Sequence, residues 1–101
     1  MIFNGVSTKN SLTLFFSTPT YDSHFYQYTL YYNLTSTVGE FDYDGFINKD
    51  DDSNLGYMDF NGVSSTTING LNENTTYYIR LYVYDSYANS NFSNVISAKT
   101  N

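Results

Sequence analysis

One run of alternating side chains, between Thr76 and Tyr84, constrains the fold more than any other feature of the sequence. Its side chains fall into two alternating sets, which are Tyr77, Ile79, Leu81 and Val83 in one and Tyr78, Arg80, Tyr82 and Tyr84 in the other. Successive side chains of a β-strand point to opposite faces, whereas one face of a helix recurs every three or four residues. The run therefore predicts a long strand whose first set faces a core and whose second set faces outward.

Shorter runs of β-branched and aromatic residues, separated by turn-forming Asn, Asp, Ser and Gly, predict further strands. They cover residues 2–6, 11–16, 25–32, 65–69 and 95–100, with weaker signals at 41–43 and 57–60. Tyr and Phe supply 20% of the 101 residues, which excludes a disordered chain. No apolar run approaches the ~18 residues that cross a bilayer. We expect one all-β domain over residues 1–101, a seven-stranded antiparallel β-sandwich that is part of a larger protein.

A motif in the C-terminal third resembles a known family. Residues 71–81, LNENTTYYIRL, are similar to the L-x-P-x-T-x-Y-x-V-x-V signature of fibronectin type III domains, which have an immunoglobulin-like sandwich fold. Thr75 matches the Thr of that signature, and Tyr77 stands where the family has its tyrosine corner. Glu73 departs from the signature because the family has Pro at this place.

Further segments resemble the same family in the expected order. Residues 11–19 are similar to its B strand, 28–32 to its C strand, and 89–93 to the stretch before its G strand. Phe16 occupies the place of the usual core Trp, and Phe can fill such a position. The stretch between the C strand and the signature is longer than in a typical member, so its strands and loops are the least predictable part of the chain.

The resemblance and the alternation together imply a single core between two sheets. Its expected members are Leu14, Phe16, Tyr28, Leu30, Leu71, Tyr77, Ile79 and Leu81. The buried hydroxyl of Tyr77 needs a polar partner, and the resemblance implies a backbone group at the preceding corner.

The acidic residues are concentrated in one segment of the chain. Seven of the ten lie between Glu40 and Asp59, where Lys49 is the only base, so this segment accounts for the formal net charge of −6. The alternating oxygens of Asp50, Asp52 and Asn54 are of the kind that Ca²⁺ takes from a flexible loop. The alternative is a solvated acidic loop that keeps the domain soluble and protects a sheet edge. The pattern leaves both interpretations open.

The outward set of the long strand is the second candidate site. If strand 25–32 neighbours strand 76–84, Tyr31 joins that set on one sheet face. The candidate partner-binding residues are therefore Tyr31, Tyr78, Arg80, Tyr82 and Tyr84. Tyr and Arg are enriched at interface hot spots, and a Tyr ring also suits stacking against a sugar. Alternatively, these side chains are cross-strand pairs that only stabilise the sheet.

Composition narrows the function classes. The acidic balance argues against nucleic acid as a partner, and the absence of Cys removes disulfides, thiolate metal sites and thiol catalysis. The single His24 lies in an expected turn, and no phosphate-binding or nucleophile-elbow motif occurs, so we expect no enzyme. Sequons at Asn33, Asn74 and Asn91 favour export.

We therefore expect an extracellular or cell-surface module without cofactors, calcium apart, that binds proteins or neighbouring domains, and glycans as a further class. An accessory carbohydrate-binding sandwich of a glycoside-degrading enzyme and a self-assembling filament or coat subunit are the alternatives, since fold does not fix function.

Overall fold

The computed structural model describes residues 2–16, 25–57, 62–63, 65–87 and 89–101. Within these residues the chain forms seven strands and one short 3-10 helix. The strands are β1 (Ile2–Ser7), β2 (Leu12–Phe16), β3 (Phe25–Asn33), β4 (Gly45–Ile47), β5 (Ser65–Ile68), β6 (Thr76–Asp85) and β7 (Ser90–Lys99), and the helix is η1 (Ser53–Gly56).

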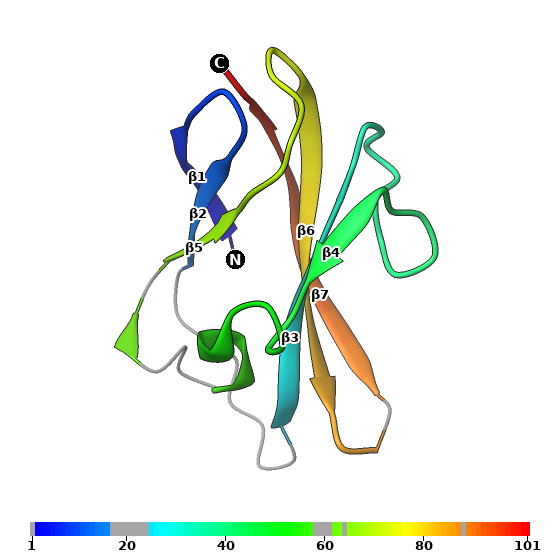
Figure 1. Cartoon of the computed structure of the whole chain (residues 1–101). Coiled ribbons are helices and arrows are strands. Elements are labelled where there is room, and N and C mark those ends of the chain that lie inside the picture. Colours follow the sequence, from blue (N-terminus) through cyan, green and yellow to red (C-terminus); the bar gives the residue numbers. More distant parts are fainter. Residues whose placement is uncertain (1, 17–24, 58–61, 64, 88) are drawn as a thin grey trace.

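The strands form two sheets that pack as the layers of a sandwich (Figure 1). One sheet has the order β1-β2-β5 and the other the order β4-β3-β6-β7. All neighbouring strands are antiparallel. The predicted seven-stranded antiparallel sandwich is confirmed.

The core between the sheets consists mostly of the predicted residues. Those that the structure confirms as buried are Leu14, Tyr28, Leu30, Leu71, Tyr77, Ile79 and Leu81. Phe16 is the last residue of β2, and its side chain lies outside the described residues. Leu55 of η1 is also fully buried in this core, which ties the long crossing segment to the sandwich.

The tyrosine corner has the expected partner. The backbone N–H of Asn72 donates a hydrogen bond of 2.9 Å to Tyr77 Oη. Thr100 closes the same corner, since its hydroxyl donates to the Asn72 carbonyl at 2.6 Å and accepts from the Thr75 N–H at 3.0 Å. The last strand is thereby fixed to the turn that precedes β6.

The structure differs from two local predictions, and a third falls mostly outside the described residues. Residues 41–43 form no strand, because Gly39 and Asp42 exchange backbone hydrogen bonds of 3.0 and 3.1 Å and close a turn, so the short strand is β4 instead. Tyr57 follows η1 rather than opening a strand, and 58–60 lie outside the described residues. The last strand begins at Ser90 and ends at Lys99.

The start of β3 also departs from simple alternation. A bulge between Phe25 and Gln27 inserts an extra residue against β6. Phe25 consequently packs on the core, with its ring 4.9 Å from that of Tyr28, whereas Tyr26 is half exposed. The bulge reverses the faces that period-two alternation assigns to these residues.

Candidate functional site

The face of the four-stranded sheet that points away from the core carries most of the predicted site residues. Tyr31 in β3 pairs with Arg80 in β6 and with Phe46 in β4. Tyr82 pairs with Phe92 in β7. Antiparallel pairing brings side chains that are distant in sequence onto one surface, which we call the outer face.

Aromatic rings on the outer face form one contact network. The ring of Tyr31 lies 5.2 Å from Tyr82 at an angle of 87° and 5.1 Å from Tyr43. The ring of Tyr82 lies 5.5 Å from that of Phe92. Such separations are those of favourable aromatic pairs. The outer aromatic cluster comprises Tyr31, Tyr43, Phe46, Tyr82, Tyr84 and Phe92.

Tyr82 is a buried member of this cluster and is hardly accessible to a partner. The alternation predicts its face correctly, but only 7% of the residue is exposed. The 34–44 segment lies on the outer side of the sheet (Figure 1). A Cβ on Gly39 would come within 2.8 Å of Tyr82 Oη, so this loop packs against the hydroxyl end of the side chain. The expectation of an outward, accessible Tyr82 is corrected accordingly.

Hydrogen bonds link the side chains of Tyr31, Tyr84 and Glu40 in series. Tyr84 Oη donates to Glu40 Oε2 at 2.9 Å, and Tyr31 Oη lies 2.7 Å from Tyr84 Oη. A phenol has one proton, so Tyr31 donates to Tyr84, which in turn donates to Glu40. Burial raises the pKa of the Tyr84 phenol, and its bonds to Tyr31 and Glu40 raise it further. Burial likewise raises the pKa of Tyr31.

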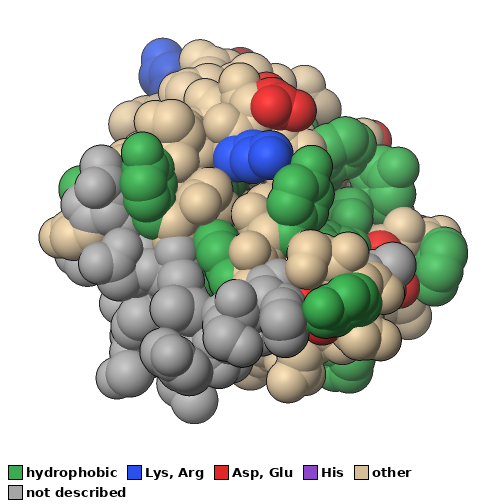
Figure 2. Space-filling model, turned by 90° about the horizontal axis from the view of Figure 1, so that it is seen from below, with side chains coloured by type: hydrophobic (Ala, Val, Ile, Leu, Met, Phe, Trp, Pro, Cys, Tyr) green, Lys and Arg blue, Asp and Glu red, His purple; other side chains and the backbone are tan. Residues whose placement is uncertain are grey.

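The accessible members of the cluster come from β4, β7 and the loop before β4. Tyr43 and Phe46 are each 44% exposed, and Phe92 is 56% exposed. The Arg80 guanidinium lies over the Phe92 ring, 4.5 Å from its centre. Hydrophobic side chains reach the surface beside acidic and basic ones at the end of the molecule that Figure 2 shows.

Tyr78, the remaining candidate, lies at the opposite end of β6 from Tyr84. It pairs with Asn33 and Ser97 and lies outside the outer aromatic cluster. The structure thus brings together four of the five predicted binding residues, Tyr31, Arg80, Tyr82 and Tyr84, and sets Tyr78 apart.

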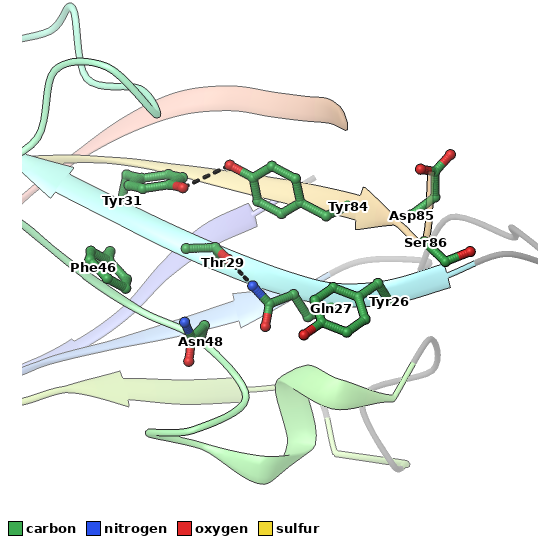
Figure 3. Close-up of a pocket in the computed structure, with 9 residues that line it drawn as sticks. All are labelled: Tyr26, Gln27, Thr29, Tyr31, Phe46, Asn48, Tyr84, Asp85 and Ser86. Atoms are coloured by element: carbon green, nitrogen blue, oxygen red, sulfur yellow. Dashed lines mark hydrogen bonds between the residues drawn. The ribbon is translucent and has the colours of Figure 1, made fainter. Parts of the chain in front are cut away.

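A cleft of about 560 Å³ opens on the outer face between β4, β3 and the end of β6 (Figure 3). Four of its lining residues are aromatic and five are polar. They are Tyr26, Tyr31, Phe46, Tyr84, Gln27, Thr29, Asn48, Asp85 and Ser86. A volume of this size is typical of a small-molecule site. The Lys49 ammonium lies 4.1 Å from the centre of the Tyr26 ring and holds that half-exposed side chain.

Hydrogen bonds of its own side chains fix the conformation of the acidic segment. Asp52 caps η1 by accepting from the Asn54 N–H at 3.1 Å, and it also accepts from the Thr66 hydroxyl. Asp50 is exposed, and its N–H donates to Asn48. No group of three or more His, Cys, Asp or Glu side chains that could hold a metal ion occurs in the described part of the chain. Calcium binding by Asp50, Asp52 and Asn54 stays a prediction.

Sequence reasoning missed Glu40, Tyr43, Phe46 and Phe92 as parts of the outer face. Alternation around 41–43 gave a signal for Tyr43, but it implied a strand at that place. Phe92 precedes the residues from which the last strand was predicted. Phe46 and Glu40 join the face through the path of the 34–47 segment, which no short-range pattern encodes.

Comparison with known proteins agrees with the architecture. The family model described as "Fibronectin type III domain" matches residues 2–99. A search among curated proteins yields no match. In the described residues, no helix has the length and apolar character needed to cross a membrane. The match covers nearly the whole chain, and the two sheets and the tyrosine corner agree with it, so the chain belongs to the fibronectin type III family.

Proposed function

We propose that this domain is a non-catalytic interaction module of an extracellular or cell-surface protein, and that it binds its partner through the outer face of the four-stranded sheet. Membership in the fibronectin type III family supports a module rather than an enzyme. Accessible sequons at Asn74 and Asn91, both exposed, support the export of the parent protein.

One observation carries the proposal: exposed aromatic rings pack against tyrosines that are themselves buried or fixed by hydrogen bonds. Tyr43 and Phe46 are nearly half exposed, whereas Tyr82, which belongs to the same cluster, is almost fully buried. Tyr31 is held by contacts with all three rings. Rigid aromatic side chains lose little conformational entropy on binding, so a pre-organised surface of this kind favours affinity.

The charge of the module limits its partners. Glu40 lies within the outer face, and exposed Asp42 and Asp44 lie in the adjoining loop. A strongly anionic partner would be repelled by these carboxylates, whereas a neutral or basic one would not.

The experiment is a cell-binding assay with cells of the organism that encodes the chain. The fluorescently labelled domain is titrated onto these cells, and bound label is measured by flow cytometry. We expect saturable binding that Tyr43→Ser combined with Phe46→Ser weakens by at least about tenfold, since each ring lost at an interface core costs on the order of 1 kcal/mol or more.

Tyr57→Ser and Val6→Ser are the matched controls. Both residues are about half exposed and lie outside the outer aromatic cluster. They should bind like the wild-type chain. Absence of saturable binding, or equal loss in the control variants, would overturn the proposal.

A further inference from the structure

We propose that the cleft on the outer face is a binding site for an uncharged glycan. This inference rests on the proposed function, because it names the ligand class of the same face. It follows from the combination of aromatic walls, amide and hydroxyl groups between them, and the absence of basic groups in the described lining.

The walls of the cleft offer flat apolar surfaces at three places. Phe46 of β4 lies on one side, the hydrogen-bonded pair of Tyr31 and Tyr84 on another, and Tyr26 at the far end (Figure 3). Phe46 and Tyr26 are 44% and 50% exposed. The Lys49 ammonium lies over one face of the Tyr26 ring, so Phe46 offers the more open stacking surface. The C–H faces of a pyranose ring are apolar and stack on such rings, while its hydroxyls stay polar.

The space between these rings is lined with hydrogen-bonding groups. Gln27 and Thr29 project from β3, and the Gln27 amide nitrogen donates to the Thr29 hydroxyl at 3.3 Å (Figure 3). The Asn48 side-chain oxygen accepts from the Asp50 N–H at 2.9 Å, which leaves its amide nitrogen as a donor. The Gln27 amide oxygen is an acceptor. Planar amides that offer both functions suit the adjacent hydroxyls of a sugar.

The charges around the cleft select an uncharged ligand. Neither Lys nor Arg belongs to the described lining, and Asp85 lies at its end. The Glu40 carboxylate accepts a hydrogen bond from the hydroxyl of Tyr84, one of the lining residues. The Asp85 carboxylate is occupied by the N–H groups of Tyr87 and Asn89, so it braces the β6–β7 turn. One described cation lies beside the cleft, the Lys49 ammonium, and it is placed over the Tyr26 ring at the far end, 4.1 Å from its centre. A carboxylated or sulfated sugar in the rest of the cleft would meet the negative charges of Asp85 and Glu40.

The same polar groups disfavour a proline-rich peptide, the other ligand that aromatic grooves commonly take. Such peptides dock in aromatic-lined grooves, where their pyrrolidine rings pack on the aromatic side chains. Covering Gln27 and Asn48 with pyrrolidine rings would leave their amides desolvated and unpaired, which is costly. Sugar hydroxyls would satisfy them instead. The composition of the cleft therefore points to a glycan.

Affinity gel electrophoresis tests the proposal with defined probes. The domain is run through native gels that contain neutral glucans, xylans, mannans or galactans, and through gels that contain alginate or hyaluronan. We expect retardation by at least one neutral polysaccharide and none by the two anionic ones. Phe46→Ala and, separately, Gln27→Leu should each weaken the retardation about tenfold, the change that one lost stacking or hydrogen-bonding contact produces.

Tyr57→Ala is the matched control for Tyr26→Ala, because the two tyrosines have nearly equal exposures of 51% and 50%. Only Tyr26→Ala should reduce retardation, with thermal melting confirming that both variants fold. The proposal is overturned if no neutral polysaccharide retards the domain, if the anionic gels retard it equally, or if Gln27→Leu and Phe46→Ala both bind like the wild-type chain.

Enzymatic and chemical treatment of the cells separates this inference from the proposed function. If the glycan inference holds, mild periodate, which cleaves vicinal diols, abolishes cell binding, and binding persists after protease treatment. Binding that resists periodate and disappears with protease would show a protein partner, which would retain the interaction module and overturn the glycan site. If the control variants lose cell binding as strongly as the cleft variants do, both the proposed function and the glycan inference are overturned.

Discussion

The two faces of the four-stranded sheet carry tyrosines from the same strand, β6, and satisfy their hydroxyls in different ways. On the inner face, Tyr77 is 1% exposed and accepts a backbone hydrogen bond from Asn72, five residues earlier. On the outer face, Tyr84 donates to Glu40, a side chain from a loop that is 44 residues away in sequence. The inner arrangement is local and built into the corner, whereas the outer one depends on where a long loop crosses the sheet.

This difference shows what alternation does and does not specify. Period two assigns a side chain to a face, and both faces are assigned correctly for Tyr77 and Tyr82. It does not specify burial, because Tyr82 on the outer face is nearly as inaccessible as the inner residues. The outer face thus combines a buried side chain, Tyr82, with accessible ones such as Tyr43 and Phe46.

Truncation of Tyr77 should produce the largest effect and tests the inner side of the comparison. We expect Tyr77→Ala to lower the free energy of unfolding by about 3–5 kcal/mol, because a buried ring leaves a cavity between the sheets. Tyr77→Phe should cost about 1 kcal/mol, since only the hydroxyl that accepts the Asn72 N–H is lost. Urea denaturation measures both. An unchanged midpoint for Tyr77→Phe would contradict a stabilising corner.

Truncation of Tyr82 tests whether this side chain of the outer face is packed as tightly as a core residue. We expect Tyr82→Ala to cost about 2–3 kcal/mol, less than Tyr77→Ala because the covering loop can settle into the space. Tyr43→Ala, on the same face but 44% exposed, should cost under about 1 kcal/mol. Equal denaturation midpoints for these two variants would mean that Tyr82 contributes no more to stability than an exposed residue of the same face.

Most of the fold is predictable from the sequence because its signals are local. The strands β1, β2, β3, β5 and β6 coincide with predicted runs to within a residue or two, and the tyrosine corner follows from a motif of eleven residues, 71–81. In each case, the pattern that specifies the element lies within the element itself. Seven of the eleven residues in the buried core cluster were accordingly predicted, whereas Leu12, Leu55, Ile68 and Ala98 were not.

The outer face was foreseen only in part because non-local contacts build it. The β3 bulge turns Tyr26 outward and Phe25 inward, and a single extra residue leaves no trace in a period-two pattern. The path of the loop is fixed by pairings such as Asn33 with Asp42, at 2.8 Å, and Gly39 with Asp42. These contacts decide that Glu40 reaches Tyr84.

The acidic segment allows a smaller but sharper test, because Asp52 has two competing roles. As a cap, it stabilises η1 and accepts from Thr66 whether or not calcium is present. We expect Asp52→Ala to lower the free energy of unfolding by about 1–2 kcal/mol in the presence of a chelator. Asp50→Asn, at an exposed position, should leave that value unchanged.

Calcium binding by the same segment predicts a different result. Any ligand that binds only the native state raises the melting temperature, and the stabilisation grows with the logarithm of the ratio of its concentration to its dissociation constant. Calcium should then raise the melting temperature of the wild-type chain, and Asp50→Asn should abolish the rise without altering the stability in chelator. Identical melting curves with calcium and with chelator would leave only the capping role.

The pH dependence of stability should give the smallest effect, and it tests the outer hydrogen-bond chain directly. Burial raises the pKa of Tyr84, Tyr31 and Tyr32 in the folded state above the unfolded value of about 10. These phenols therefore contribute stability that is fully present below about pH 10 and is lost as the pH rises through their folded pKa values, since the unfolded chain releases protons first. Thermal melting between about pH 9 and 11 should show a decline that is less steep for Tyr84→Phe. Glu40→Gln should give an intermediate slope, because the hydrogen bond to a charged acceptor is lost but the phenol stays buried. Equal slopes for all three proteins would mean that the chain from Tyr31 through Tyr84 to Glu40 does not persist in solution, and the outer face would then lack the rigid wall on which its cleft is built.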